Sequence, residues 1–143
     1  MPLTRWIEKR WVRSVLLLGY LTLMFIVSSR SDVSMPVGFP HADKIAHLIE
    51  YSILGWLVAG VLDYKESWRR WKLYLIVIGA VLLFGCLDEL NQSRVPGRDS
   101  SLYDLMADLA GAIVGSLLWR WTRQFERKKE KGRCPNPQHQ RQQ

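Results

Sequence analysis

The sequence has few of the residues and motifs that mark disulfide-rich proteins or the common hydrolases. It contains two cysteines in 143 residues, Cys86 within an apolar run and Cys134 in a polar tail. Two cysteines placed so far apart predict neither a disulfide framework nor a zinc-binding motif. The chain also has no HExxH and no GxSxG motif, which excludes the zinc-protease and serine-hydrolase arrangements that those motifs specify. We therefore expect no bound metal and no cofactor.

Acidic residues are outnumbered, with 13 Asp and Glu against 20 Lys and Arg and a net charge of +7. A basic chain raises nucleic acid as a partner, because lysine and arginine supply affinity for phosphate. In this sequence, however, the basic residues gather at the ends of apolar runs, where membrane topology already accounts for them. We predict that the protein does not bind nucleic acid.

Long apolar runs are what the sequence does contain. Four of them are long enough to cross a bilayer as helices, and they predict an all-α, four-span transmembrane helical bundle within residues 1–122. The expected helices cover residues 14–29, 43–62, 73–87 and 101–121. The first run also fits a cleavable signal peptide, so whether residues 1–29 are removed stays open. Residues 123–143 form a basic polar tail without apolar periodicity, which we expect to be disordered.

Small residues recur every four positions in the fourth expected helix, at Ala107, Gly111 and Gly115. This spacing lets membrane helices approach closely, because the small side chains leave room for a neighbouring backbone. We therefore predict that this helix packs tightly against another one.

The basic residues also predict how the chain is oriented in the membrane. Most of them flank the N-terminus, the loop at residues 63–72 and the polar tail, and far fewer fall on the other side. The positive-inside rule then places both termini in the cytosol. Tryptophans at the same helix ends agree with this orientation, because indole rings favour the membrane interface. They include Trp11, Trp71, Trp119 and Trp121.

Ionisable side chains lie at the opposite, outward-facing ends of the helices. An acid near hydrocarbon costs roughly 2.5 to 3.5 kcal/mol on insertion scales, so such a residue is by default a functional-site hypothesis. Asp43, His47 and Tyr51 recur every four residues and share one helix face. The residues expected to bind a ligand are Asp43, Lys44, Tyr51, Asp88, Gln92, Arg98 and Asp104, and those expected to act as acid or base are His47, Glu89 and Asp108.

Some of these residues have an equally ordinary explanation as helix caps. Asp43 can cap the N-terminus of the second helix, and Ser101 followed by Asp104 has the spacing of a capping box at the start of the fourth. His47 and Asp108 lie one turn deeper, where no cap is needed. They could still be polar residues that only satisfy each other and hold the helices together.

Two adjacent acids, Asp88 and Glu89, end the third expected helix, where negative charge opposes the helix macrodipole. A positive group should neutralise them, and Arg94 and Arg98 are the nearest in sequence. Alternatively, the arginines hold an anionic ligand while a carboxylate moves a proton. A metal site is chemically possible but has no repeated ligand motif to support it; its donors would be His47, Glu50, Glu89 and Asp108.

The two polar groups, in this order, resemble the VanZ-like family of small membrane proteins over about residues 43–119. The first motif is matched by Asp43, Lys44, His47 and Tyr51, and the second by Asp88, Glu89, Gln92, Arg98, Asp104 and Gly111. The resemblance implies a cell-envelope protein of the bacterial plasma (inner) membrane. The founding member of that family is associated with resistance to the lipid-tailed glycopeptide teicoplanin. The resemblance does not imply a particular reaction.

From these observations we expect a multi-pass membrane protein with an outward-facing polar pocket between its second, third and fourth helices. The pocket should bind an anionic lipid-linked envelope component or an amphiphilic glycopeptide, with membrane lipids as further partners. One alternative is a membrane-embedded enzyme that performs acid/base chemistry on an envelope lipid. Another is a structural protein whose polar cluster only ties the helices together. Whether the protein is an enzyme stays open, and so does its oligomeric state.

Overall fold

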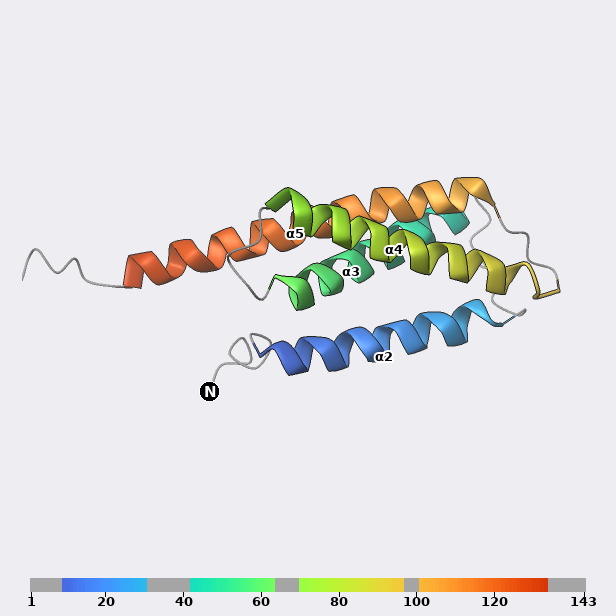
Figure 1. Cartoon of the computed structure of the whole chain (residues 1–143), viewed down its shortest axis with the longest axis horizontal. Coiled ribbons are helices and arrows are strands. Elements are labelled where there is room, and N and C mark those ends of the chain that lie inside the picture. Colours follow the sequence, from blue (N-terminus) through green and yellow to red (C-terminus); the bar gives the residue numbers. More distant parts are fainter. Residues whose placement is uncertain (1–8, 31–41, 64–69, 97–100, 134–143) are drawn as a thin grey trace, which may run out of the picture.

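Four helices and no strand make up the part of the chain that the structure describes. The computed structural model describes residues 9–30, 42–63, 70–96 and 101–133. The helices are α2 (Arg10–Ser28), α3 (Ala42–Leu62), α4 (Arg70–Gln92) and α5 (Leu102–Arg133). They run side by side in an elongated bundle, beyond which the C-terminal part of α5 extends (Figure 1). The prediction of an all-α fold with four spans is confirmed.

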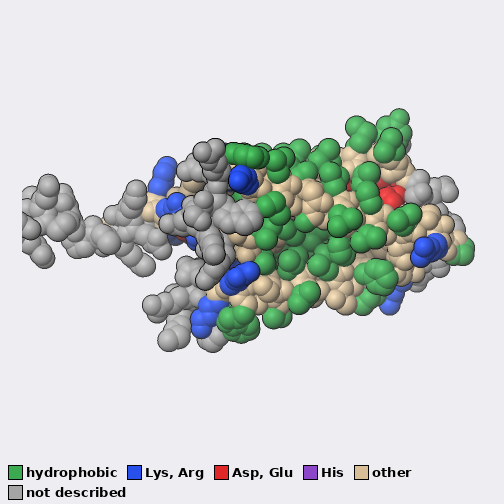
Figure 2. Space-filling model, viewed as in Figure 1, with side chains coloured by type: hydrophobic (Ala, Val, Ile, Leu, Met, Phe, Trp, Pro, Cys, Tyr) green, Lys and Arg blue, Asp and Glu red, His purple; other side chains and the backbone are tan. Residues whose placement is uncertain are grey.

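Each of the four helices is long and apolar enough to cross a membrane. Large apolar side chains on their outer surfaces are exposed, among them Leu18, Leu75, Leu83 and Leu117. Figure 2 shows hydrophobic side chains spread over the middle of one face, with lysines and arginines toward its ends. Helices with apolar outer faces are stable beside lipid rather than water. The chain is therefore a multi-pass membrane protein, whereas the cytosolic position of its termini stays a prediction.

The most extensive helix contact in the bundle joins α3 and α5, and glycines on α5 make it possible. A Cβ atom on Gly111 would lie 2.7 Å from the carbonyl oxygen of Leu48. Gly115 faces the backbone of Ser52 and Trp56 at a similarly close approach. Any larger residue at these positions would push the two backbones apart. The predicted small-residue contact is confirmed for both glycines, and its partner is α3.

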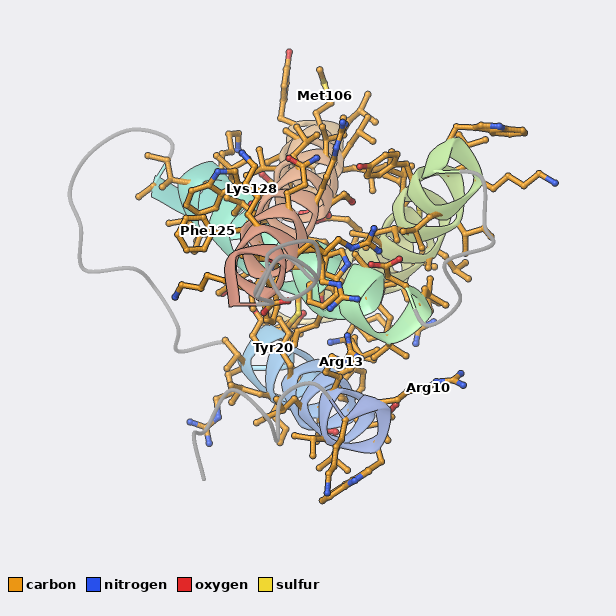
Figure 3. The ribbon with its side chains drawn as sticks, turned by 90° about the vertical axis from the view of Figure 1, so that its left-hand side faces the viewer. Arg10, Arg13, Tyr20, Met106, Phe125 and Lys128 are labelled. Carbon is orange, nitrogen blue, oxygen red and sulfur yellow. The ribbon has the colours of Figure 1, made fainter. Side chains whose placement is uncertain are left out.

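Helix α2 lies along one side of the other three helices (Figure 1). The Tyr20 hydroxyl donates to the backbone carbonyl of Glu50 at 3.0 Å, which fastens α2 to α3. The Asn91 amide donates to Ser29 Oγ at 3.0 Å, which fastens the end of α2 to α4. Viewed along the bundle, Arg13 points from α2 toward the other helices (Figure 3).

Helices α4 and α5 continue beyond their predicted C-terminal ends. Helix α4 continues past residue 87 to Gln92, so the two adjacent acids lie within its last turns. Helix α5 continues past residue 121 to Arg133, and the disorder predicted for residues 123–133 is wrong. Lysine, arginine and glutamate are good helix formers in water, and Arg123 and Glu126 form an i,i+3 ion pair of 3.3 Å. Residues 134–143, where disorder was also predicted, lie outside the described residues.

Candidate functional site

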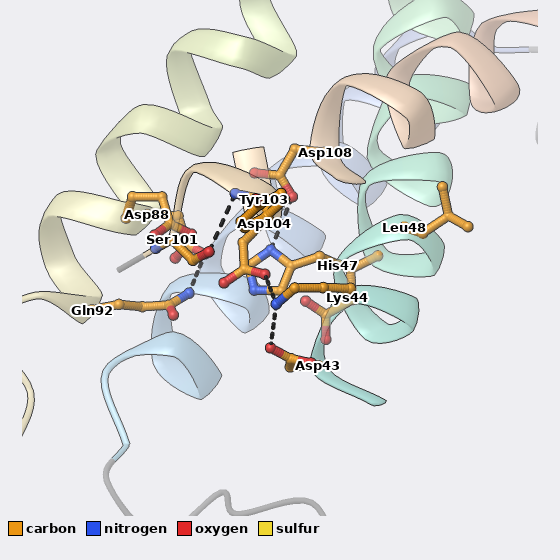
Figure 4. Close-up of polar contacts among 12 residues, drawn as sticks. Asp43, Lys44, His47, Leu48, Asp88, Gln92, Ser101, Tyr103, Asp104 and Asp108 are labelled. Carbon is orange, nitrogen blue, oxygen red and sulfur yellow. Dashed lines mark hydrogen bonds and ion pairs between the residues drawn. The ribbon is translucent and has the colours of Figure 1, made fainter. Parts of the chain in front are cut away.

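Five carboxylates gather at one end of the bundle, which we call the acidic end: Asp43, Asp88, Glu89, Asp104 and Asp108. Helices α3 and α5 begin at this end and α4 finishes there (Figure 1). Side chains from all three helices therefore point toward one another, as the close-up shows (Figure 4). The fold brings together both groups of polar residues that the sequence singles out.

A buried histidine–aspartate pair lies at the centre of the acidic end. His47 Nδ1 lies 2.9 Å from Asp108 Oδ1, and 6% of His47 and none of Asp108 is exposed. With Asp108 ionised and His47 neutral, the carboxylate only accepts hydrogen bonds, so Nδ1 carries the hydrogen and the second ring nitrogen is left as an acceptor. The pair thereby fixes both the tautomer and the orientation of the imidazole.

Tyr51 lies one helical turn further into the bundle, beside His47. Its ring is nearly parallel to the imidazole, with 4° between the planes and 6.0 Å between the centroids. The side chain is completely buried, and its hydroxyl has no hydrogen-bond partner among the described residues. Tyr51 therefore presents an aromatic face to the histidine and closes the polar cluster on the side of the bundle interior.

Lys44 connects α3 to α5 across the acidic end. Its ammonium nitrogen lies 2.8 Å from Asp43 Oδ2 and 3.0 Å from Asp104 Oδ1. The Asp43 side chain is 57% exposed and that of Asp104 only 6%. Asp43 and Lys44 both belong to α3, and solvent screens their exposed pair. The contact with Asp104 therefore joins the two helices.

Glu89 reaches from α4 to the start of α5. Its Oε2 accepts a hydrogen bond of 2.9 Å from the backbone N–H of Ser101, and Ser101 Oγ accepts one of 3.2 Å from the N–H of Tyr103. The capping-box prediction is therefore wrong about the acid. Glu89 of α4, and not Asp104, accepts the hydrogen bond from the N-cap N–H of Ser101, while Asp104 contacts Lys44. The other oxygen of Glu89, Oε1, is buried and has no hydrogen-bond partner among the described residues.

The neighbouring acid, Asp88, is satisfied within its own helix. The amide of Gln92, which is buried, donates to Asp88 Oδ2 at 2.8 Å. Arg94 is exposed, and within the described residues it pairs with neither acid of α4. Arg98 lies outside the described residues, so its anion contact stays a prediction. Instead, two basic side chains of α3, Lys44 and His47, contact Asp104 and Asp108 of α5.

Gly85 was not among the predicted site residues, but it makes room for Asp108. A Cβ atom on Gly85 would lie 2.7 Å from Asp108 Oδ2, closer than real Cβ contacts. That oxygen is buried, and no described residue hydrogen-bonds to it. One signal for this role is in the sequence, because Gly85 and Glu89 are four residues apart and share a face of α4.

The opposite end of the bundle, which we call the basic end, carries Arg13, Arg120, Arg123 and Arg127. The Trp119 indole donates to Asp63 Oδ2 at 3.0 Å. The guanidinium carbons of Arg13 and Arg123 lie 5.4 and 5.8 Å from the Trp119 ring centre, a cation–π arrangement. Trp119 is buried, so its indole packs inside the bundle, and the cytosolic position of this helix end stays a prediction. A pocket beside it is lined by Asp63, Tyr74 and the arginines of α5.

Three residues of the acidic end form a group that could hold a metal ion. His47, Glu89 and Asp104 each offer one donor atom, and these atoms lie within 4.8 Å of one another. They come from α3, α4 and α5, respectively. The metal ligands considered from the sequence were His47, Glu50, Glu89 and Asp108. In the structure Asp104 takes part, whereas Asp108 hydrogen-bonds to the histidine ring.

A family model described as VanZ/LLP1 matches residues 4–123 of the chain. The match is wider than the predicted 43–119 and takes in α2 as well as both polar motifs. Neither the curated proteins nor the solved structures include a match to the chain. Because the family model covers most of the sequence, including three membrane helices and the larger part of the fourth span, this protein belongs to the VanZ/LLP1 family.

Proposed function

We propose that this VanZ-like envelope membrane protein binds the head group of an anionic lipid-linked envelope component at its acidic end. Family membership and the four spans support the envelope and membrane parts of this proposal. The acidic end would face outward, as the distribution of basic residues predicts. Teicoplanin would be an alternative ligand because, like a lipid-linked envelope component, it joins a polar head to a lipid tail.

The observation that carries the proposal is the burial of the His47–Asp108 pair at membrane-helix ends. Withdrawing ionisable groups from water is costly, and apolar residues of similar size often stabilise a bundle as well or better. The polar groups also do not fully satisfy one another, since Glu89 Oε1 and Asp108 Oδ2 have no hydrogen-bond partners among the described residues. This arrangement supports a binding role more than a purely structural one.

Apolar side chains beside the acidic end suit the tail of a lipid ligand. Leu90 directly follows Glu89, and Leu102, Tyr103 and Met106 occupy the first turns of α5; all four are exposed. Met106 points away from the bundle (Figure 3). A ligand could therefore place its acyl chains along α4 and α5 while its head group reaches the polar residues.

Acid/base catalysis on an envelope lipid is a second candidate, which the orientation of His47 favours. With Nδ1 held by Asp108, the second ring nitrogen is positioned to take a proton from a hydroxyl group or water. The unpartnered oxygen of Glu89 is a second possible proton carrier. In this candidate function the bound lipid is turned over rather than only held.

The thermal stability of the purified chain in detergent tests the proposal against undecaprenyl phosphate, a lipid-linked cell-wall precursor and teicoplanin. A ligand at about 100 times its dissociation constant adds roughly 2.7 kcal/mol. We expect one of these ligands to raise the melting temperature of the wild type and of Glu126→Gln, a carboxylate change at the basic end. The rise should be smaller in Asp104→Asn. No stabilisation by any ligand would contradict the proposal.

The same material separates binding from catalysis. For an enzyme in which Glu89 acts only as a proton carrier, Glu89→Gln should keep the ligand-induced stabilisation and lose turnover, as followed by mass spectrometry of the lipid. The glutamine keeps an oxygen that can accept the hydrogen bond from Ser101 N–H. A variant that turns the lipid over at the wild-type rate would rule out Glu89 as the proton carrier.

A further inference from the structure

The donor atoms of His47, Glu89 and Asp104 come from three different helices and converge within 4.8 Å. One imidazole nitrogen and two carboxylate oxygens are a donor set that divalent transition-metal ions accept. His47 and Asp104 are buried and Glu89 is half-buried, so the group is not a patch of surface acids. A small adjustment of the side chains would bring all three donors to one ion.

The hydrogen bond between His47 and Asp108 prepares the histidine for this role. Since Nδ1 donates to Asp108 at 2.9 Å, the second ring nitrogen is the one that can bind a cation. His47 is more than nine-tenths buried, and no described residue hydrogen-bonds to that nitrogen. In Figure 4 the ring lies between Asp108 on one side and Asp104 on the other. A carboxylate behind a histidine in this way is a common companion of metal-binding imidazoles.

The balance of charge at the acidic end also points to a cation. Five carboxylates lie there, and the basic side chains that contact them within the described residues are Lys44 and His47. Glu89 Oε1 is buried without a hydrogen-bond partner among those residues. Uncompensated carboxylates are costly to bury, and a divalent ion would neutralise two of them at once.

Lys44 lies where such an ion would compete with it. Its ammonium nitrogen is 3.0 Å from Asp104 Oδ1, so it supplies positive charge to one of the three donor residues. The side chain is 28% exposed and also reaches Asp43 at the surface. It can therefore keep its surface partner while Asp104 turns to a metal ion.

We propose that His47, Glu89 and Asp104 bind one divalent transition-metal ion, with Asp108 as the residue that orients His47. Three protein ligands leave at least one coordination position open. That position would take a phosphate oxygen of the lipid head group, a step that rests on the function proposed above. The ion would thus let a site rich in carboxylates hold an anionic ligand.

The test uses the full chain in nanodiscs of neutral lipid, treated with EDTA and then titrated with Mn²⁺ or Zn²⁺. Calorimetry and the Mn²⁺ electron paramagnetic resonance signal should report one ion per chain, with empty nanodiscs as the blank. We expect His47→Ala, Glu89→Gln and Asp104→Asn each to weaken binding at least tenfold. Glu126→Gln, which removes a carboxylate at the basic end, should bind as the wild type does.

Lys44→Met gives a result that a merely structural cluster would not. Removing the competing ammonium group should tighten binding of the metal ion several-fold, although the ion pair between Lys44 and Asp104 is lost. Failure of the wild type to bind either ion, or wild-type binding by both Glu89→Gln and Asp104→Asn, would overturn the metal site. Each variant is first checked for helical content and a cooperative melt, so that an unfolded variant is not counted.

A lipid-binding measurement with and without the ion separates this inference from the proposed function. Undecaprenyl phosphate that binds only after addition of Mn²⁺ or Zn²⁺ would support both. Ion binding without any lipid binding would support the metal site and contradict the lipid function. Lipid binding that is unchanged by EDTA, in a chain that binds no ion, would contradict the metal site alone.

Discussion

The two ends of the bundle use charge in different ways. At the basic end Arg13 and Arg123 lie against the Trp119 ring, and Asp63 is shared by the Trp119 indole and Arg123. At the acidic end, carboxylates from three helices surround a buried histidine, and two of their oxygens have no hydrogen-bond partner among the described residues. The positive-inside rule and aromatic packing account for the basic end. Neither explains the acidic end.

This difference shows where functional residues should be sought in a small membrane protein. A charge that membrane topology requires can remain partly exposed at the interface, as Arg120 does. A charge that is withdrawn from water, as at Asp108, has to be compensated by a partner or a ligand. The kind of charge that is buried therefore separates the two ends: carboxylates surround a histidine at the acidic end, and guanidinium groups pack on an indole ring at the basic end.

The largest expected effect comes from breaking the helix contact on which both ends depend. Gly115→Leu should cost at least about 3 kcal/mol, because the new side chain would meet the backbone of α3. Gly79→Leu is the matched control, since a Cβ atom on Gly79 has nothing within 4 Å. Size-exclusion chromatography after heating measures the folded fraction of each variant. Equal melting temperatures would mean that the α3–α5 contact does not hold the bundle together.

The same substitution at each end sharpens the comparison. Asp108→Ala leaves the His47 N–H buried without its acceptor and should cost about 1 to 3 kcal/mol. Asp63→Ala also removes an acceptor, but the side chain is 25% exposed and water can replace it, so we expect about 0.5 kcal/mol. Asp108→Asn, which keeps an acceptor oxygen, should fall between them. Thermal melts in detergent that reverse this order would remove the distinction between the ends.

Removing the charge of Arg98 should weaken ligand binding, whereas removing the charge of Arg120 should not. Arg98→Gln is expected to weaken binding of undecaprenyl phosphate about tenfold with the fold intact, because a charge-assisted hydrogen bond is worth about 1.5 to 3 kcal/mol. Arg120→Gln, at the basic end, should leave the affinity within about twofold. Calorimetric titration measures both values. Equal losses would indicate a general attraction between a basic protein and an anionic lipid.

The smallest perturbation tests which end faces outward. A cysteine at Gly38, placed in a chain with Cys86→Ala and Cys134→Ser, should react with a membrane-impermeant maleimide on intact cells. Helix α2 ends and helix α3 begins at the same end of the bundle, the acidic end (Figure 1), and the positive-inside rule predicts that the residues between them are outside. Protection of this cysteine until the cells are lysed would invert the orientation and put the acidic end in the cytosol.

Much of the acidic end could be predicted from single residues, but not their pairing. His47 and Asp108 each stood out because an ionisable group one turn inside a membrane helix is costly. Nothing in the sequence fixes how α3 and α5 are rotated about their axes, so the contact between residues 61 positions apart could not be deduced. The glycines of α5 predicted a close neighbour, but the identity of α3 as that neighbour came from the structure.

The errors have a common physical origin in tertiary contacts and solvent. The local spacing of Ser101 and Asp104 fits a capping box, yet Glu89 of another helix takes the N-cap nitrogen. Trp119 falls at a helix end, where indole rings often face the membrane interface, but it packs inside the bundle against Trp56, Arg13 and Arg123. The extension of α5 was missed because the prediction relied on apolar periodicity, which reports burial. A solvent-exposed helix can form without such a pattern when its residues have high helix propensity.

The length of α5 determines how far its charges reach. At about 1.5 Å per residue, an upright helix of this length measures about 48 Å, whereas the hydrocarbon core is about 30 Å thick. The segment from Thr122 to Arg133 would thus extend about 18 Å, roughly two screening lengths in physiological salt. Charges toward the end of this segment, such as Lys129, are then largely screened from the surface potential of the lipid. The end of α5 therefore extends as a continuous helix beyond the hydrocarbon core, and the positive-inside rule applies mainly to the arginines nearest the lipid.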